Sequence, residues 1–178
     1  MRKLRVEELG RMDAAEFAQA GKMPLTVVLD NVRSMHNVGS AFRTADAFRV
    51  EQILLCGITA CPPHREIHKT ALGAENTVHW AHYATTLEAI RWLKAEGYQV
   101  LAVEQTDRSQ PLHTLQVKKE KHYALVFGNE AFGVDDDALA ECHIAVEIPQ
   151  YGTKHSLNIS VSLGIVVWEM AQRLLIPA

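Results

Sequence analysis

Apolar residues in this chain of 178 residues fall into short unbroken runs, and the segments between them have helical spacing. Unbroken apolar runs of this length are typical of strands that are buried on both faces of a sheet. They predict strands at 25–30, 52–58, 78–83, 98–104, 123–127 and 144–148, of which 78–83 has the weakest pattern.

Helical spacing marks the segments between these strands. Val38, Phe42 and Ala45 predict one apolar face of a helix that opens near Asn37. Further helices are predicted at 86–96, 135–141 and 158–174. Strands that alternate with helices predict an α/β fold, with a mostly parallel sheet and helices on both of its faces.

Three polar loops follow strands of the predicted sheet, at 31–37, 128–133 and 150–158. In an open parallel sheet, ligands bind beyond the carboxyl ends of the strands, so we expect these loops to share one site. No G-x-G-x-x-G follows the first strand, which excludes the dinucleotide fingerprint. Val134-Asp135 stands where a phosphate-binding P-loop needs Lys-Ser/Thr.

The last of these loops carries more polar chemistry than a helix start requires. Lys154, His155, Ser156 and Asn158 directly precede a long apolar helix, whereas one side chain suffices as a cap. The segment is therefore predicted to be part of a functional site.

Three stretches in this order resemble the motifs of the SpoU (TrmH-type) branch of the SPOUT RNA methyltransferases. They read LDNVRSMHNVGSAFRTADAF at 29–48, LVFGNEAFGVD at 125–135 and YGTKHSLNISVSLGIVVWE at 151–169. The resemblance implies a deep C-terminal trefoil knot, which physical reasoning alone would never propose. It also implies S-adenosylmethionine (SAM) as cofactor and methyl transfer to a ribose 2′-hydroxyl of tRNA or rRNA, with a slight preference for tRNA.

The same resemblance implies a catalytic set of Asn37, Arg43, Glu130, Ser156 and Asn158. Because a guanidinium barely deprotonates, we expect Arg43 to clamp the substrate phosphate or the developing oxyanion rather than act as a base. Asn37 is expected to cap its helix and to orient Arg43 or substrate. Glu130 is expected to hold Arg43 or to lie near the sulfonium. Ser156 and Asn158 are expected to bond ribose or phosphate.

For the cofactor, the resemblance implies backbone contacts from Gly128, Ile148 and Leu157, with Glu104 nearby at its strand end. The apolar side chains can wall an adenine slot while their backbone groups bond its edge. Plain core packing is the alternative interpretation for Ile148 and Leu157.

The net charge of −3 is opposite to the basic excess of a nonspecific nucleic-acid binder. Basic residues nevertheless outnumber acidic ones between positions 31 and 70. The candidate RNA contacts are Arg33, His36, Arg65, His68, Lys69 and Lys154, and Arg65, His68 and Lys69 are expected to lie over the active site.

A competing pattern is the C-x2-H-x3-H spacing of Cys61, His64 and His68. Tetrahedral zinc needs a fourth ligand, and no matching Cys or His pair completes a zinc module, so we expect no metal.

One domain is expected over 1–178, with 1–22 as a short extension, because this length supports one good core. Three cysteines, no signal peptide and no membrane-length apolar run predict a cytoplasmic protein.

The last helix is apolar nearly all round, through Val161, Ile165, Trp168 and Leu175, which favours a homodimer. A helper protein for RNA recognition stays open. The alternative function is a non-catalytic RNA-binding protein on the same fold, although every polar motif position is filled.

Overall fold

The computed structural model describes residues 1–175, apart from the side chain of Val6. Its centre is one seven-stranded sheet in the order β3-β2-β1-β6-β4-β7-β5, and each neighbouring pair is parallel. The strands are β1 (Met23–Asp30), β2 (Val50–Cys56), β3 (His79–Tyr83), β4 (Gln99–Val103), β5 (Gln110–Pro111), β6 (Tyr123–Phe127) and β7 (Ile144–Glu147). The predicted parallel sheet is confirmed. The short β5 was not predicted, because its two residues form no apolar run.

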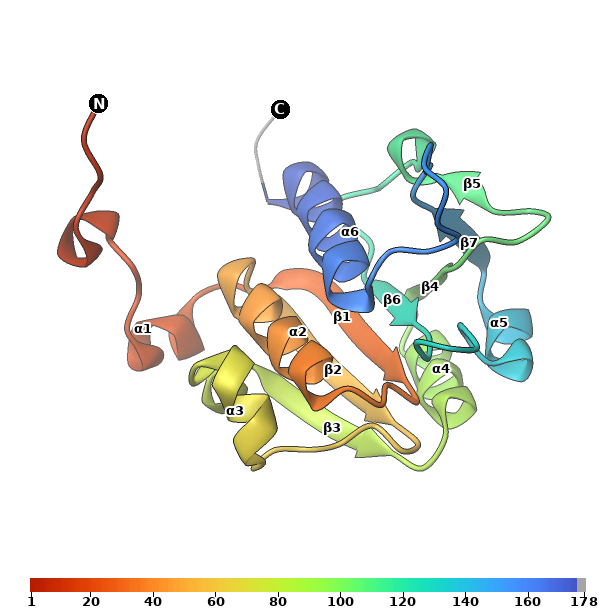
Figure 1. Cartoon of the computed structure of the whole chain (residues 1–178), viewed down its shortest axis with the longest axis horizontal. Helices are drawn as coiled ribbons and strands as arrows, with labels where there is room; N and C mark the ends of the chain where they lie inside the picture. The colour runs from red at the N-terminus through yellow and green to blue at the C-terminus, as the bar shows by residue number, and fades with distance from the viewer. Residues whose placement is uncertain (176–178) are drawn as a thin grey trace.

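Helices cover both faces of this sheet, as Figure 1 shows. Helices α2, α3 and α6 pack on one face, and α4 and α5 pack on the other. The helices are α1 (Ala14–Gln19), α2 (Met35–Ala47), α3 (Arg65–Ala71), α4 (Thr86–Ala95), α5 (Asp136–Glu141) and α6 (Ile159–Leu174), with single 3-10 turns at Val6–Leu9, Ala74–Asn76 and Leu112–Thr114.

The central strand β1 is buried along nearly its whole length, because both of its faces meet helices. Successive side chains of a strand point to opposite faces. Val27 and Leu29 therefore join the core beneath α2 and α6, whereas Val28 joins the core beneath α4. This two-sided burial explains why the strand reads as a continuous apolar run rather than an alternating one.

The start of α2 differs from the prediction. The N-cap is Ser34, whose Oγ accepts a hydrogen bond from the Asn37 backbone N–H at 3.3 Å, and the helix begins at Met35. Asn37 therefore lies in the first turn, so the expectation that its side chain caps the helix is wrong. Its amide is left to contact other loops instead.

Helix α3 was missed by the sequence pattern. Two prolines precede it, and only Ile67 and Ala71 of its seven residues are buried, which is too little apolar periodicity for a prediction. The segment ahead of β1 leads away from the body of the protein in Figure 1. Among its described side chains, Phe17 is the one that is buried. Within residues 1–175, no helix has the length and apolar character needed to cross a membrane.

Candidate active site

A cavity of about 540 Å³ lies at the carboxyl ends of β4, β6 and β7. It is lined by the loop after β4, the loop at 128–133 and the segment between β7 and α6. These segments are far apart in sequence and meet because parallel strands end at the same sheet edge. Seven predicted site residues line the cavity: Glu104, Gly128, Glu130, Ile148, Ser156, Leu157 and Asn158.

The carboxylate of Glu130 holds the first turn of α2. It accepts hydrogen bonds from the backbone N–H of Arg33 at 3.0 Å, from the backbone N–H of Ser34 at 3.1 Å and from Asn37 Nδ2 at 2.9 Å. Burial acts to raise the pKa of Glu130, but these donors outweigh burial and lower it. An ionised carboxylate therefore fixes the approach to α2.

The expected contact between Glu130 and Arg43 is wrong for a single copy of the chain. Among residues 1–175, the oxygens of Glu130 bond the start of α2, and Arg43 lies further along that helix. Arg43 is exposed there and makes no hydrogen bond or ion pair within the described chain. It lines a second hollow, of about 410 Å³, with Lys69 and Phe48.

Asn158 links α6 to the Glu130–Asn37 pair. Its Nδ2 donates to Asn37 Oδ1 at 3.3 Å, while its Oδ1 accepts from the Ser160 backbone N–H at 2.8 Å and caps α6. Asn158 is therefore the N-cap of α6. Glu130, Asn37 and Asn158, one from each of the three motifs, form a continuous hydrogen-bonded chain at the edge of the cavity.

The loop after β6 needs glycine at its first position. Asn129 and Gly133 exchange backbone hydrogen bonds of 2.8 and 2.9 Å, which fold the loop back on itself. A Cβ on Gly128 would lie 2.0 Å from the carbonyl carbon of Gly133, closer than any side chain tolerates. Glu104 completes the closure, because its Oε2 accepts from the Val134 N–H at 3.1 Å.

The far wall of the cavity combines apolar side chains with unused backbone groups. Leu157 is 38% exposed, and neither its N–H nor its C=O joins a hydrogen bond within residues 1–175. Gln105 fixes this wall, because its Nε2 donates to the His155 carbonyl at 3.0 Å. An apolar wall with free peptide groups suits a small cofactor that has both apolar and hydrogen-bonding edges, and the volume lies in the usual range for such sites, roughly 300–1,000 Å³.

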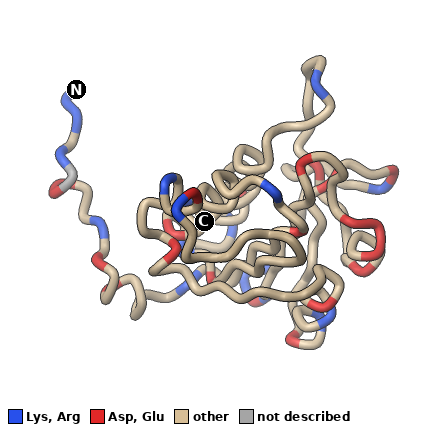
Figure 2. The backbone as a smooth tube through the Cα atoms, turned by 60° about the horizontal axis from the view of Figure 1, so that its bottom comes forward, with Lys and Arg blue, Asp and Glu red and all other residues tan. Residues whose placement is uncertain are grey.

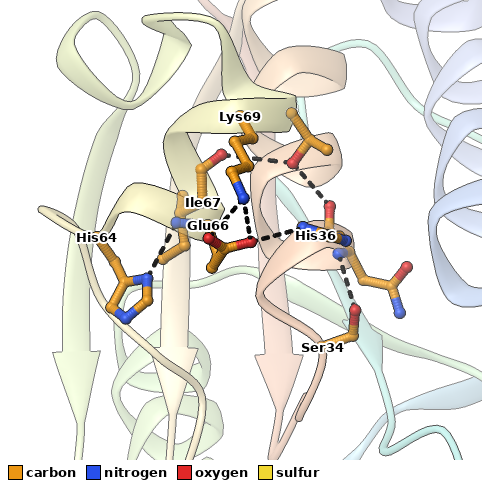
Figure 3. Close-up of polar contacts among 8 residues, drawn as sticks. Ser34, His36, His64, Glu66, Ile67 and Lys69 are labelled. Atoms are coloured by element: carbon orange, nitrogen blue, oxygen red, sulfur yellow. Dashed lines mark hydrogen bonds and ion pairs between the residues drawn. The ribbon is translucent and has the colours of Figure 1, made fainter.

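The predicted RNA contacts lie on several elements. Figure 3 shows Glu66 of α3 between two of them, with its Oε2 3.1 Å from His36 Nε2 and its Oε1 2.7 Å from Lys69 Nζ. This triad ties α3 to α2, so residues 65–71 form a helix that is docked on its neighbour. Arg65 is exposed on the same helix and forms no ion pair in the described chain.

Neither the other candidate contacts nor the distribution of charge identifies one RNA-binding face. Arg33 and Lys154 are exposed, and His68 Nδ1 lies 2.5 Å from Glu75 Oε1. Figure 2 shows lysine, arginine and acidic residues spread along the whole backbone. Charge alone therefore marks no single binding face.

The three residues with zinc-like spacing have separate partners. His64 Nδ1 accepts from the Glu66 N–H at 3.2 Å and caps α3, His68 pairs with Glu75, and the Cys61 thiol lies 3.8 Å from the Thr59 carbonyl. Residues 1–175 contain no group of three or more side chains placed to hold a metal ion.

Two supports of the site were not predicted. Asn129 donates from Nδ2 to the Asn31 carbonyl at 2.7 Å. The buried Asp30 accepts from Asn31 Nδ2 and from the Asp135 N–H, both at 2.8 Å. A carboxylate at the end of an otherwise apolar strand was the available signal for Asp30.

Comparison with known proteins identifies the family to which this sequence is similar. The model of the SpoU rRNA Methylase family matches residues 24–168, which include the cavity, α2 and most of α6. The chain belongs to this family.

Two curated relatives illustrate the range of the family. The chain is 32% identical over 166 residues to a tRNA (guanosine(18)-2′-O)-methyltransferase of Thermus thermophilus, covering 93% of this chain and 83% of that protein. It is 31% identical over 146 residues to the 23S rRNA (guanosine-2′-O-)-methyltransferase RlmB of Neisseria meningitidis serogroup B. That match covers 82% of this chain but only 57% of the relative, so the chain spans little more than half the length of that SpoU relative.

Solved structures of similar proteins share the fold. An AdoMet-bound rRNA methyltransferase from Sinorhizobium meliloti superposes with a TM-score of 0.79 at 34% identity, covering 89% of this SpoU chain and 59% of that one. The TrmH/SpoU tRNA modifying enzyme of A. aeolicus gives a TM-score of 0.79 at 26% identity, covering 90% and 80%.

Proposed function

We propose that this protein transfers a methyl group from SAM to a ribose 2′-hydroxyl of a tRNA or an rRNA. The observation that carries the proposal is the hydrogen-bonded chain of Glu130, Asn37 and Asn158 at the edge of the cavity. The names of the two curated relatives support the reaction and both classes of RNA.

SAM, which supplies an electrophilic methyl group, fits the cavity of about 540 Å³. We propose that Gly128, Ile148 and Leu157 bind it through their backbone groups. Glu104 supports the loop that closes the cavity, because it bonds the Val134 N–H. The AdoMet-bound relative with the same fold supports this assignment.

The chain's own residues have to activate and position the acceptor. A ribose hydroxyl is a weak nucleophile, so stabilising the charge that develops on its oxygen lowers the barrier. We propose that Ser156 and Asn158 bond the ribose or its phosphate, and that Arg43 clamps the phosphate or the developing oxyanion. Glu130 and Asn37 position these groups by fixing the start of α2 against α6.

A homodimer would bring Arg43 next to a second copy. Val161, Ile165 and Trp168 of α6 form an exposed apolar face, and the Trp168 ring lies 5.8 Å from the ring of Phe48. Phe48 shares the hollow that holds Arg43. A second copy packed on the α6 face would therefore lie beside Arg43, so we propose that dimerisation completes the site.

We propose the following RNA contacts around this site: Arg33, His36, Arg65, His68, Lys69 and Lys154. Arg65, which is exposed and forms no ion pair within residues 1–175, and the exposed Lys154 are the best placed to meet phosphate. The three cysteines are free thiols, which supports a reducing, cytoplasmic setting.

We also propose that the C-terminal part of the chain is threaded as a trefoil knot, as the family resemblance implies. Two features support it: β6 and β7 lie on either side of β4, and the segments that follow them line one cavity. A crystal structure traced from β6 to α6 tests this threading. A path that does not pass through the loop would contradict it.

Purified protein, labelled SAM and total cellular RNA test the proposed reaction. We expect label to enter RNA. Label-free RNA that still binds the protein would point instead to a non-catalytic RNA-binding protein on the same fold.

A further inference from the structure

Two aromatic side chains near the cavity are far more exposed than the other exposed aromatic residues of the described chain. Phe132 is 85% exposed and lines the cavity, and Tyr151 is 96% exposed and directly follows the cavity residue Gln150. Trp80, Trp92 and Trp168 are exposed by half or less. A solvent-facing ring in the lining of a polar cavity, with a second exposed ring one residue beyond that lining, indicates a ligand that covers them.

Phe132 is presented on a rigid support. Asn129 Oδ1 accepts hydrogen bonds from the backbone N–H groups of Ala131 at 2.9 Å and Phe132 at 3.3 Å. The backbone pair between Asn129 and Gly133 closes the same turn, and Asn129 Nδ2 anchors it to the end of β1. The ring therefore projects from a fixed turn, so little conformational freedom is lost when a ligand packs on it.

Phe132 is also close in sequence to the hydrogen-bonded chain of polar residues at the edge of the cavity. Glu130, two residues earlier, belongs to the hydrogen-bonded chain with Asn37 and Asn158, where the proposed function places the acceptor ribose. Single-stranded RNA is recognised by stacking of unpaired bases on aromatic side chains. The base joined to a ribose at this position would lie within reach of the cavity rim.

We propose that Phe132 stacks on an unpaired nucleobase of the RNA substrate, at or next to the methylated nucleotide, and that Tyr151 provides a second stacking ring from the loop after β7. This inference rests on the proposed function, because it uses the same cavity. It adds a substrate-binding subsite that involves neither the polar catalytic set nor the cofactor wall.

A second copy of the chain is the competing occupant, and the residues argue against it. The exposed apolar face of α6, made of Val161, Ile165 and Trp168, does not line the cavity. Phe132 instead lies among polar and charged groups, including Glu130 and Gln150. An isolated ring in polar surroundings suits a heteroaromatic base better than an apolar protein interface.

The test compares Phe132→Ala, Phe132→Trp and Tyr151→Ala with wild type, using total tRNA or rRNA as substrate. Leu72→Ala is the control, because Leu72 is also exposed but lies at the end of α3 and outside the cavity. We expect Phe132→Ala to raise the KM for RNA and the Kd in filter binding by about tenfold. We expect Tyr151→Ala to weaken RNA binding by a smaller factor, and Phe132→Trp to restore it. SAM affinity by calorimetry and mass by light scattering should stay as in wild type.

Several outcomes would overturn this subsite. An unchanged RNA Kd in Phe132→Ala would do so. Weakened SAM binding would make the ring part of the cofactor wall, and an altered mass would place it at a subunit interface. If wild type bound RNA through Phe132 but transferred no methyl group, the proposed function would fail while the stacking contact stood.

Discussion

Glu130, in the loop after β6, accepts a 2.9 Å hydrogen bond from the side chain of Asn37 in the first turn of α2, across 93 positions of sequence. Asn158 then donates to the same Asn37 side chain. The segments that follow β1, β6 and β7 are thereby held in one arrangement. The amide of Asn37 is the centre of this arrangement, because its nitrogen bonds one loop and its oxygen the other.

The depressed pKa of Glu130 predicts a pH-dependent stability. A carboxyl group whose folded pKa is lowered stabilises the fold above its unfolded pKa, near 4.5, and loses that contribution as pH falls through the folded pKa. Wild type should therefore lose more stability than Glu130→Gln between neutral pH and about pH 3. Urea unfolding at a series of pH values measures this. Parallel pH profiles for the two proteins would contradict the role of the carboxylate.

Arg43→Ala should keep the fold and SAM affinity but lose at least ~100-fold in methyl transfer, the scale for losing one oxyanion contact. The fold should survive because the side chain is exposed and makes no hydrogen bond or ion pair within the described chain. Arg91→Ala is the matched control, since Arg91 is an exposed arginine on α4, on the opposite face. Near-normal turnover of the Arg43 variant would remove it from the catalytic set.

Gly128→Ala should disturb the cavity, because its Cβ would lie 2.0 Å from the Gly133 carbonyl carbon and force the loop to open. We expect weaker SAM binding and a lower Tm. Gly152→Ala is the control, since nothing lies within 4 Å of the Cβ it would add. Equal SAM affinities for the two variants would show that the tight turn does not shape the cofactor site.

Trp168→Glu should produce monomers, because it places a charge in the exposed apolar face of α6. Trp168→Phe should leave the dimer intact. Light scattering distinguishes the two states. A dimer that survives Trp168→Glu would require an interface elsewhere, and Arg43 would lose its proposed place beside a second copy.

The elements that could be predicted are those determined by the local pattern of apolar and polar residues. The runs around Val27 and Leu125 predicted central strands, because burial on both faces selects mainly apolar residues. The convergence of the loops followed from parallel topology. Helix α3 was missed because its stability depends on tertiary contacts, including the bonds of Glu66 to His36 and Lys69, rather than on its own periodicity.

The finer geometry of the site could not be predicted from the sequence for a similar reason. Both Ser34 and Asn37 have side chains that can cap a helix. In the structure Ser34 accepts from the Asn37 backbone N–H, while the Asn37 side chain donates to Glu130 instead. The position of Arg43 away from the first cavity depends on the packing of α2 against α3 and α6. Long-range packing of this kind leaves no signature in local spacing.

The most direct test of the proposed chemistry is the position of the methyl group in the product RNA. RNA treated with the protein and SAM would be digested with nuclease and analysed by mass spectrometry. We expect one added methyl on ribose, and resistance to alkaline hydrolysis at the adjoining phosphodiester, because the 2′-oxygen that attacks it is blocked. A methyl group on the base with the ribose untouched would contradict the account.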